Sequence, residues 1–240
     1  CYLSATAWCC FIRVFDMSKL FAKKSSMYIK FNLSVRERFL TPQTHRFCAI
    51  FVFLLASFYS VCSANSHSNT AIFAGGCFWC MEYPFDRLEG VLSTKPGYTG
   101  GVSPNPSYEV VSGGMSGHVE VVQVIFDPTK ISYKQLLEVY WKNIDPFQGN
   151  GQFCDIGLQY KAIIFVNSSV QKLIAEESRQ NLEKSYFGNE AIVVEIRPAS
   201  VFFEAETYHQ DYYQKNPIRY KLYRYQCGRD QRLRELWGSQ

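Results

Sequence analysis

The sequence predicts an α/β (α+β) two-layer sandwich, in which a mixed sheet is flanked by helices and followed by a long irregular C-terminal tail. Short β-rich runs alternate with amphipathic helical stretches, as in folds that pack helices on a sheet. Residues 118–126 carry apolar side chains on both faces of a strand, which indicates an interior position. With 240 residues and 47% hydrophobic content, the chain can bury a substantial core.

In the first half of the domain, β-rich runs predict the strands, and Gly and Pro mark where they end. The expected elements are a strand at 70–74, a turn at 75–76, a helix from 78, a strand at 91–98, a loop at 99–107 and a strand at 118–126. The loop (TGGVSPNPS) is long enough to carry function.

In the second half, helix caps and breakers set the boundaries. Ser132 and Gln135 form a capping box, Gly188 ends a helix, and Pro198 ends a strand. The expected elements are a helix at 132–143, a strand at 161–166, a helix at 168–187, a strand at 191–196 and an aromatic helix at 202–214.

The chain divides into a leader at 1–64 and a catalytic domain at 65–240. The leader holds 8 of the 25 Lys and Arg residues and 2 of the 21 Asp and Glu residues, so the basic charge belongs to it. The run at 47–62 is apolar and follows Arg46, which resembles a secretory signal with cleavage after Ala64. We therefore expect export to the periplasm or secretion, with a membrane anchor or a cytoplasmic protein as alternatives. Residues 1–45 are interpreted as an over-extended N-terminus.

The stretch GGCFWC at 75–80 places Cys77 between an apolar strand and two aromatic residues, at the start of a predicted helix. Exposed N–H groups and the helix dipole stabilise an anion there, so we expect a lowered pKa for Cys77 and a nucleophilic thiolate. The alternative is two buried cysteines in an aromatic core. Five of the nine cysteines lie in the leader, and the four that remain, Cys77, Cys80, Cys154 and Cys227, favour redox chemistry.

Glu120 is an acid on an apolar face. By the two-residue period of a strand, it shares a face with His118, Val122, Val124 and Phe126. Desolvation there raises a carboxyl pKa, and a carboxyl that stays protonated near neutral pH can act as a general acid. The alternative is an acid at a strand end that pairs with Lys or Arg.

Other residues narrow the function further. Tyr108 and Tyr160 come from irregular segments, where a phenol hydroxyl can hold a polar oxygen. Arg229, Arg232 and Arg234 are interpreted as a solvated helix face, so we expect no binding of nucleic acid. The segment GYTGG has neither the spacing nor the lysine of a phosphate-binding loop, and we expect no metal, flavin or nucleotide cofactor.

The domain resembles the A-type peptide-methionine sulfoxide reductases over residues 70–238. The motifs that carry the resemblance are GGCFWC, GYTGG, NPSY (105–108), GHVEVVQVIFDP (117–128), DIGLQY (155–160), YHQDYYQKNP (208–217) and RLRELWG (232–238). Their order along one chain is highly specific, whereas each motif alone is weak.

The resemblance implies a role for each site residue. Cys77 would attack the sulfoxide sulfur and Glu120 would protonate its oxygen. The other implied residues are Tyr108 and Tyr160, which hydrogen-bond that oxygen, Asp155, which supports the site, and Phe78, Trp79 and His118, which bind the substrate. The product would be methionine, free or in a protein, with specificity for the S epimer.

The resemblance also implies a sulfenic acid on Cys77, which a second thiol converts to a disulfide that a thioredoxin-like donor reduces. The candidates for that resolving thiol are Cys227, Cys80 and Cys154, and Cys227 is favoured because it lies in the tail. Many family members have glycine where this chain has Cys80. We expect a monomer that repairs oxidative damage.

Two alternative functions are compatible with the same residues. The Cys77-x-x-Cys80 pair after a strand is also typical of a thioredoxin-type thiol-disulfide oxidoreductase. The thiols with His118 or His209 would alternatively form a structural zinc site in a binding module, although the chain offers a single CxxC.

Overall fold

The computed structural model describes residues 69–188 and 191–238. The predicted leader at 1–64, including the signal-like run at 47–62 and the expected cleavage site, lies outside the described residues. Within the described part, no helix combines the length and the apolar character that crossing a membrane requires.

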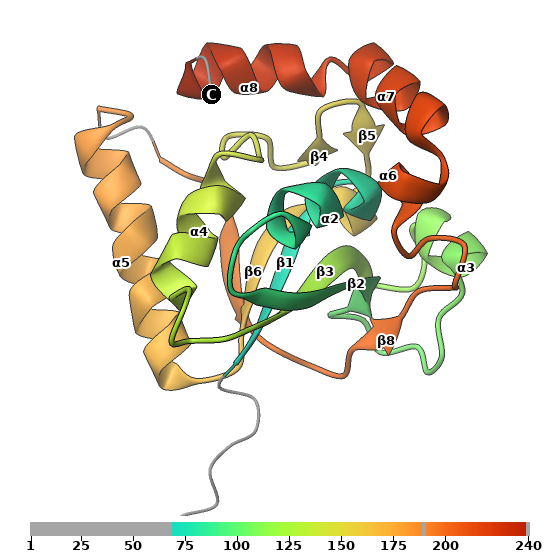
Figure 1. The fold of residues 1–240 in the computed structure, drawn as a ribbon, viewed down its shortest axis with the longest axis horizontal. Helices are drawn as coiled ribbons and strands as arrows, with labels where there is room; N and C mark the ends of the chain where they lie inside the picture. Colours follow the sequence, from blue (N-terminus) through green and yellow to red (C-terminus); the bar gives the residue numbers. More distant parts are fainter. Residues whose placement is uncertain (1–68, 189–190, 239–240) are drawn as a thin grey trace, which may run out of the picture. The chain divides into compact units, whose positions relative to one another are not determined.

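A mixed sheet of six strands forms the centre of the domain, in the order β7-β6-β1-β3-β2-β8 (Figure 1). Its strands are β1 (Thr70–Gly75), β2 (Val91–Thr99), β3 (Val119–Phe126), β6 (Ala162–Val166), β7 (Glu195–Pro198) and β8 (Phe203–Glu204). Neighbours pair antiparallel except β6 and β7, which run parallel. Strands β4 (Gly151–Gln152) and β5 (Asp155–Ile156) form a separate two-stranded sheet. The predicted mixed sheet and the interior position of residues 118–126 are therefore confirmed.

The helices end where local sequence signals place them. They are α2 (Phe78–Asp86), α3 (Tyr108–Ser112), α4 (Tyr133–Trp141), α5 (Ser169–Ser185), α6 (Tyr212–Lys215), α7 (Pro217–Gln226), α8 (Arg229–Trp237) and the 3₁₀ helix η1 (Leu158–Tyr160). Helix α4 begins with the predicted capping box, in which the side chains and backbones of Ser132 and Gln135 bond reciprocally.

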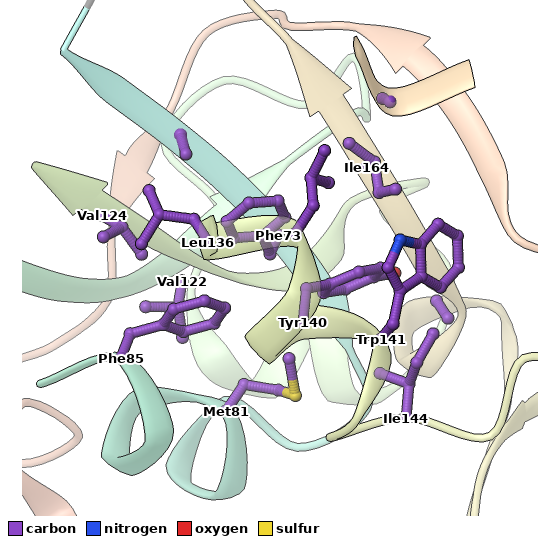
Figure 2. Close-up of a cluster of buried hydrophobic side chains, with 14 of the residues drawn as sticks. Phe73, Met81, Phe85, Val122, Val124, Leu136, Tyr140, Trp141, Ile144 and Ile164 are labelled. Carbon is purple, nitrogen blue, oxygen red and sulfur yellow. The ribbon is translucent and has the colours of Figure 1, made fainter. Parts of the chain in front are cut away.

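The main core lies between one face of the sheet and helices α2 and α4. Figure 2 shows strand side chains such as Phe73 and Val122 facing Met81 and Phe85 from α2 and Tyr140 from α4. The alternate strand residues form a smaller cluster on the other face, against Ala199 and Phe202. Because β3 contributes to both clusters, Glu120 takes its orientation from a rigid strand at the centre of the sheet.

Phe73 is the central ring of the main core. Its ring centroid lies 5.1 Å from that of Phe85 and 5.0 Å from that of Tyr140, and the side chain is fully buried. Replacing it by alanine should destabilise the domain by about 3–5 kcal/mol, because the packed surroundings cannot collapse into the cavity. Urea unfolding measures this loss. The exposed Val102 replaced by alanine is the control, for which we expect a change within about 0.5 kcal/mol.

Three predicted elements are wrong. Residues 191–194 are irregular, and β7 starts only at Glu195. The expected helix at 202–214 is instead the edge strand β8, a turn and the short α6, because residues 203–204 pair with β2 and Asp211 adopts φ 53°. The expected irregular tail is helical, since Pro217 begins α7 and Gly228, at φ 69°, allows the turn into α8.

Candidate active site

The turn between β1 and α2 aims Cys77 into the site. Gly76 has φ 82°, and a Cβ on it would come within 2.7 Å of the Gln152 side chain, so only glycine fits there. Cys77 follows as the N-cap of α2, with φ −52° and ψ 120°. The predicted strand, glycine turn and helix are therefore confirmed, and the thiol stands at a helix N-terminus.

A small cavity of about 80 Å³ contains the groups that can carry chemistry. Its lining residues are Cys77, Phe78, Trp79, Tyr108, Glu120, Asp155, Tyr160 and Tyr223. Seven of them were named from the sequence and come from five separate segments of the chain. Tyr223 of α7 was not predicted, because the surrounding run RYKLYRYQ contains several tyrosines and no spacing that singles one out.

Two carboxyl groups bind the first N–H groups of α2. The Phe78 N–H donates to Glu120 Oε2 at 3.0 Å, and the Cys77 N–H donates to the Asp155 carboxyl. Burial raises the pKa of Glu120 to about 8, against the Phe78 hydrogen bond, and the nearby Asp155 and Cys80 raise it further. Burial also raises the pKa of Asp155, which accepts a hydrogen bond from the Tyr223 hydroxyl. Glu120 therefore holds its proton at neutral pH, as the alternation of β3 predicts.

The expected lowering of the Cys77 pKa is wrong. Burial raises the pKa of the Cys77 thiol, and Cys80 and the Glu120 and Asp155 carboxyls raise it further. The physical reason is that the carboxyl oxygens occupy the helix N–H groups expected to stabilise a thiolate. A hydrogen bond from Cys77 lowers the pKa of Cys80 to about 7, assisted by Arg229 and Arg224 and opposed by burial. The two thiols therefore titrate as one interacting pair, in which the Cys77 hydrogen bond favours negative charge on Cys80.

The aromatic side of the cavity is held by a segment near the C-terminus. Trp79 stacks on Tyr212, with ring centroids 3.7 Å apart, and its Nε1 donates to His209 Nδ1 at 2.9 Å. The Phe78 ring also contacts His209, at a centroid distance of 4.9 Å. These contacts fix an apolar wall beside the Cys77 thiol.

Tyr108 and Tyr160 line the same cavity, and their hydroxyls keep their protons near neutral pH. Burial, with Glu120 and Cys77 as neighbours, raises the pKa of Tyr108 to about 12, and burial also raises that of Tyr160. The backbone N–H of Tyr108 donates to Glu206 Oε1 at 2.8 Å, which ties the start of α3 to the C-terminal segment.

His118 lies outside this cavity. Its Nδ1 accepts a hydrogen bond from the Gly101 N–H at 3.2 Å, and its Nε2 lies 2.8 Å from the Ser103 carbonyl oxygen. Its place on the Glu120 face is as predicted, but the strand carries it away from Cys77 toward the 99–107 loop. His209 contacts Trp79, so neither histidine stands with the thiols as the zinc alternative requires.

The other predicted thiols occupy two different positions. Cys80 is buried beside Cys77 and packs against Tyr212 and Tyr220. Cys154 and Cys227 form a disulfide, which joins the loop before Asp155 to the end of α7. The favoured Cys227 is therefore bonded to Cys154 in this state, and Cys80 is the free thiol next to Cys77.

One arginine departs from the expected solvated helix face. Arg229 begins α8 with its side chain buried, whereas Arg232 pairs with Asp145 and Arg234 is exposed. No local pattern distinguishes the three, because the difference comes from the turn at Gly228 and from what lies beneath α8.

The chain is similar to known proteins of one family. Residues 69–240 match the family model described as peptide methionine sulfoxide reductase. The chain is 48% identical over 170 residues to the peptide methionine sulfoxide reductase MsrA of Ligilactobacillus salivarius, covering 71% of this chain and 98% of that protein. It is 50% identical over 168 residues to the MsrA of Streptococcus pyogenes serotype M5, covering 70% and 98%.

Solved structures show the same similarity. Reduced Mxr1 of Saccharomyces cerevisiae matches with a TM-score of 0.58 and 31% identity, over 62% of this chain and 85% of that one. Methionine sulfoxide reductase A of Corynebacterium diphtheriae matches with a TM-score of 0.56 and 30% identity, over 65% and 78%.

Proposed function

This chain belongs to the peptide methionine sulfoxide reductase family, and from that premise we propose how its cavity reduces a sulfoxide. The protein is an oxidoreductase that converts methionine sulfoxide to methionine. The main support for this proposal is that Cys77 and the buried, protonated Glu120 line the same small cavity. The matches favour this activity over a thioredoxin-type oxidoreductase, for which Cys77 and Cys80 alone would form the site.

In the first step, the Cys77 sulfur attacks the sulfoxide sulfur while Glu120 gives its proton to the sulfoxide oxygen. The Tyr108 and Tyr160 hydroxyls donate hydrogen bonds to that oxygen as it gains negative charge. The oxygen ends on Cys77, so a thiol and a sulfoxide become a sulfenic acid and a thioether. The sulfur of Cys77 is oxidised as that of the substrate is reduced.

Substrate position follows from the shape of the cavity. Phe78 and Trp79 take the S-methyl group, because their rings form its apolar wall. Asp155 supports the site by accepting from the Cys77 N–H and the Tyr223 hydroxyl. With the methyl group and the oxygen held on different walls, we expect the S epimer to be favoured. Methionine release from the separate S and R sulfoxides tests this, and equal rates would contradict it.

In the second step, we propose that Cys80 resolves the sulfenic acid. Its sulfur attacks the Cys77 sulfur, a disulfide forms, and water leaves with the oxygen. Because Cys77 is an N-cap with non-helical dihedrals, its side chain can reach Cys80 without unwinding α2. A thioredoxin-like dithiol then reduces that disulfide. The Cys154–Cys227 pair is a candidate to pass electrons from this dithiol to the Cys77–Cys80 disulfide by thiol–disulfide exchange.

One oxidation cycle identifies the resolving thiol. After a single turnover of the fully reduced protein, we expect mass mapping to find a Cys77–Cys80 disulfide. The Cys80→Ala variant should still release about one equivalent of methionine per enzyme, because Cys77 is the thiol that takes the sulfoxide oxygen in the first step. A Cys77–Cys227 or Cys77–Cys154 disulfide in the wild-type protein would assign the step to that residue instead. Failure of Cys80→Ala to release methionine would restore the thioredoxin-type alternative.

We further propose that the protein is exported and acts as a monomer. The apolar run at 47–62 behind Arg46, and the small residues Ser63 and Ala64, support export. N-terminal sequencing of the protein from fractionated cells tests this: a start at residue 65 outside the cytoplasm supports it, and an uncleaved membrane-bound or cytoplasmic chain contradicts it. Light scattering of the purified protein gives the oligomeric state.

A further inference from the structure

Arg229 is the buried arginine at the start of α8. Its side chain is 1% exposed and lies beneath the glycine turn that precedes Cys77. Its Nη2 donates to the carbonyl oxygens of Gly75, at 3.0 Å, and Asn143, at 2.6 Å, and lies 2.9 Å from the Met81 sulfur. A Cβ on Gly76 would come within 3.5 Å of Nη1. The guanidinium therefore contacts residues on both sides of the Cys77-to-Cys80 segment.

The positive charge of Arg229 has no carboxylate beside it. Its acceptors are two carbonyl oxygens and a thioether, its guanidinium carbon lies 4.4 Å from the Phe153 ring centroid, and Nε has no hydrogen-bond partner. Within residues 69–188 and 191–238, no ion pair includes Arg229, whereas Arg224 pairs with Asp230 at 2.7 Å. A buried cation without a counter-charge is strongly unfavourable, so a nearby group must supply negative charge.

The two thiols are among the groups that can supply that charge, because Arg229 contacts Gly75 and Met81, on either side of the segment that holds them. The ionisable side chains acting on Arg229 are Cys80, Cys77, Tyr223 and the like-charged Arg224. Burial raises the pKa of Tyr223 far above neutrality, so this phenol stays uncharged. Among the groups that interact with Arg229, the two cysteines and the Asp155 carboxyl, whose pKa Arg229 lowers, are the ones that can become negative near neutral pH.

We propose that Arg229 is a positioning residue whose positive charge holds one negative charge on the Cys77–Cys80 pair before any substrate binds. This inference rests on the proposed function only in taking Cys77 as the nucleophile. When Cys77 attacks, its proton moves to the Cys80 sulfur. The pair keeps its single charge through that transfer, and no oxidant or reductant is consumed.

The other charged groups around the pair do not explain that charge. Asp155 from β5 opposes it, because negative charge on this carboxyl repels a thiolate, and Glu120 from β3 opposes it once the pH rises above about 8 and its carboxyl ionises. Arg224 from α7 favours it, but the Asp230 carboxylate beside Arg224 offsets much of its field. The hydrogen bond from Cys77 is the main cause of the lowered pKa of Cys80, and the positive charge of Arg229 lowers it further.

Alkylation of the resting protein tests the proposal without any sulfoxide. The rate of iodoacetamide modification of Cys77 and Cys80 is measured across pH 5–10 on the full chain, with fragment-ion mapping of the modified sulfur. In Arg229→Gln, whose amide can still donate to the carbonyl oxygens, the rate at pH 7 should fall about tenfold or more, since one pKa unit is a factor of ten. Arg229→Lys should restore most of the rate.

The matched control is Arg234→Gln, which removes the same charge from an exposed position on α8 and should leave the profile unchanged. A folded Arg229→Gln protein with the wild-type profile would overturn the proposal. If Arg229→Gln does not fold, the wild-type profile decides: alkylation that begins only above about pH 9 would show no resting thiolate. Alkylation does not depend on reductase activity, so a failure here is distinct from a failure of the proposed function.

Discussion

Replacement of Cys77 by serine is expected to lower methionine formation by at least about 10³-fold, because a serine hydroxyl ionises too weakly to attack a sulfoxide sulfur. The fold should survive, since the change is nearly isosteric and the N-cap backbone is unchanged. The measurement is release of methionine from a methionine-S-sulfoxide peptide in a single turnover with excess enzyme.

Cys80→Ser is the matched control, because it alters the other buried thiol of the same segment. It should block the catalytic cycle after the first methionine and leave the first release within a few-fold of the wild-type amount. A Cys77→Ser protein that still turns over at an ordinary rate would show that Cys77 is not the nucleophile. If neither Cys77→Ser nor Cys80→Ser releases a first methionine, the substitutions have damaged the site.

The Glu120→Gln variant is expected to lose about 10²–10⁴-fold in the rate of the reductase step, the range for loss of a general acid. The amide oxygen can still accept from the Phe78 N–H, so α2 should stay in place and substrate binding should be roughly preserved. Single-turnover rates at several sulfoxide concentrations separate the chemical step from binding.

The control for Glu120 is Glu82→Gln. Glu82 is also buried on the helix side of the core, but its Oε1 accepts from the Asp211 N–H and it does not line the cavity. We expect its reductase step to stay within a few-fold of wild type. Equal losses in the two variants, or an unchanged rate in Glu120→Gln, would contradict the acid role.

The same carboxyl sets an alkaline limit on the reaction. Because burial raises the pKa of Glu120 to about 8, the carboxyl is protonated below that pH and loses its proton above it. A proton donor is active only in its protonated form, so the rate of the reductase step should fall as pH rises through about 8. The Glu120→Gln variant should not show this fall in rate at alkaline pH. The measurement is the single-turnover rate as a function of pH.

The sequence by itself determined what depends on near neighbours. Side-chain alternation in β3 placed Glu120 on the buried face, and the glycine turn with the following helix placed Cys77 at an N-cap. The family motifs then identified Tyr108, Tyr160 and Asp155, which the structure brings to the same cavity. The placements of Glu120 and Cys77 use only the local backbone rules of a strand and a helix start, whereas the other three residues rest on the family resemblance.

Only the tertiary structure decided the features that depend on contacts far apart in the chain. Tyr223 reaches the cavity because α7 packs over β5, and Cys154 meets Cys227 across 73 residues. The Cys77 thiol has a raised pKa because folding buries it, and because Cys80 and carboxyls from two other strands lie close to it. Charge and burial depend on the distances between folded segments, and these distances are not encoded in any local pattern of residues.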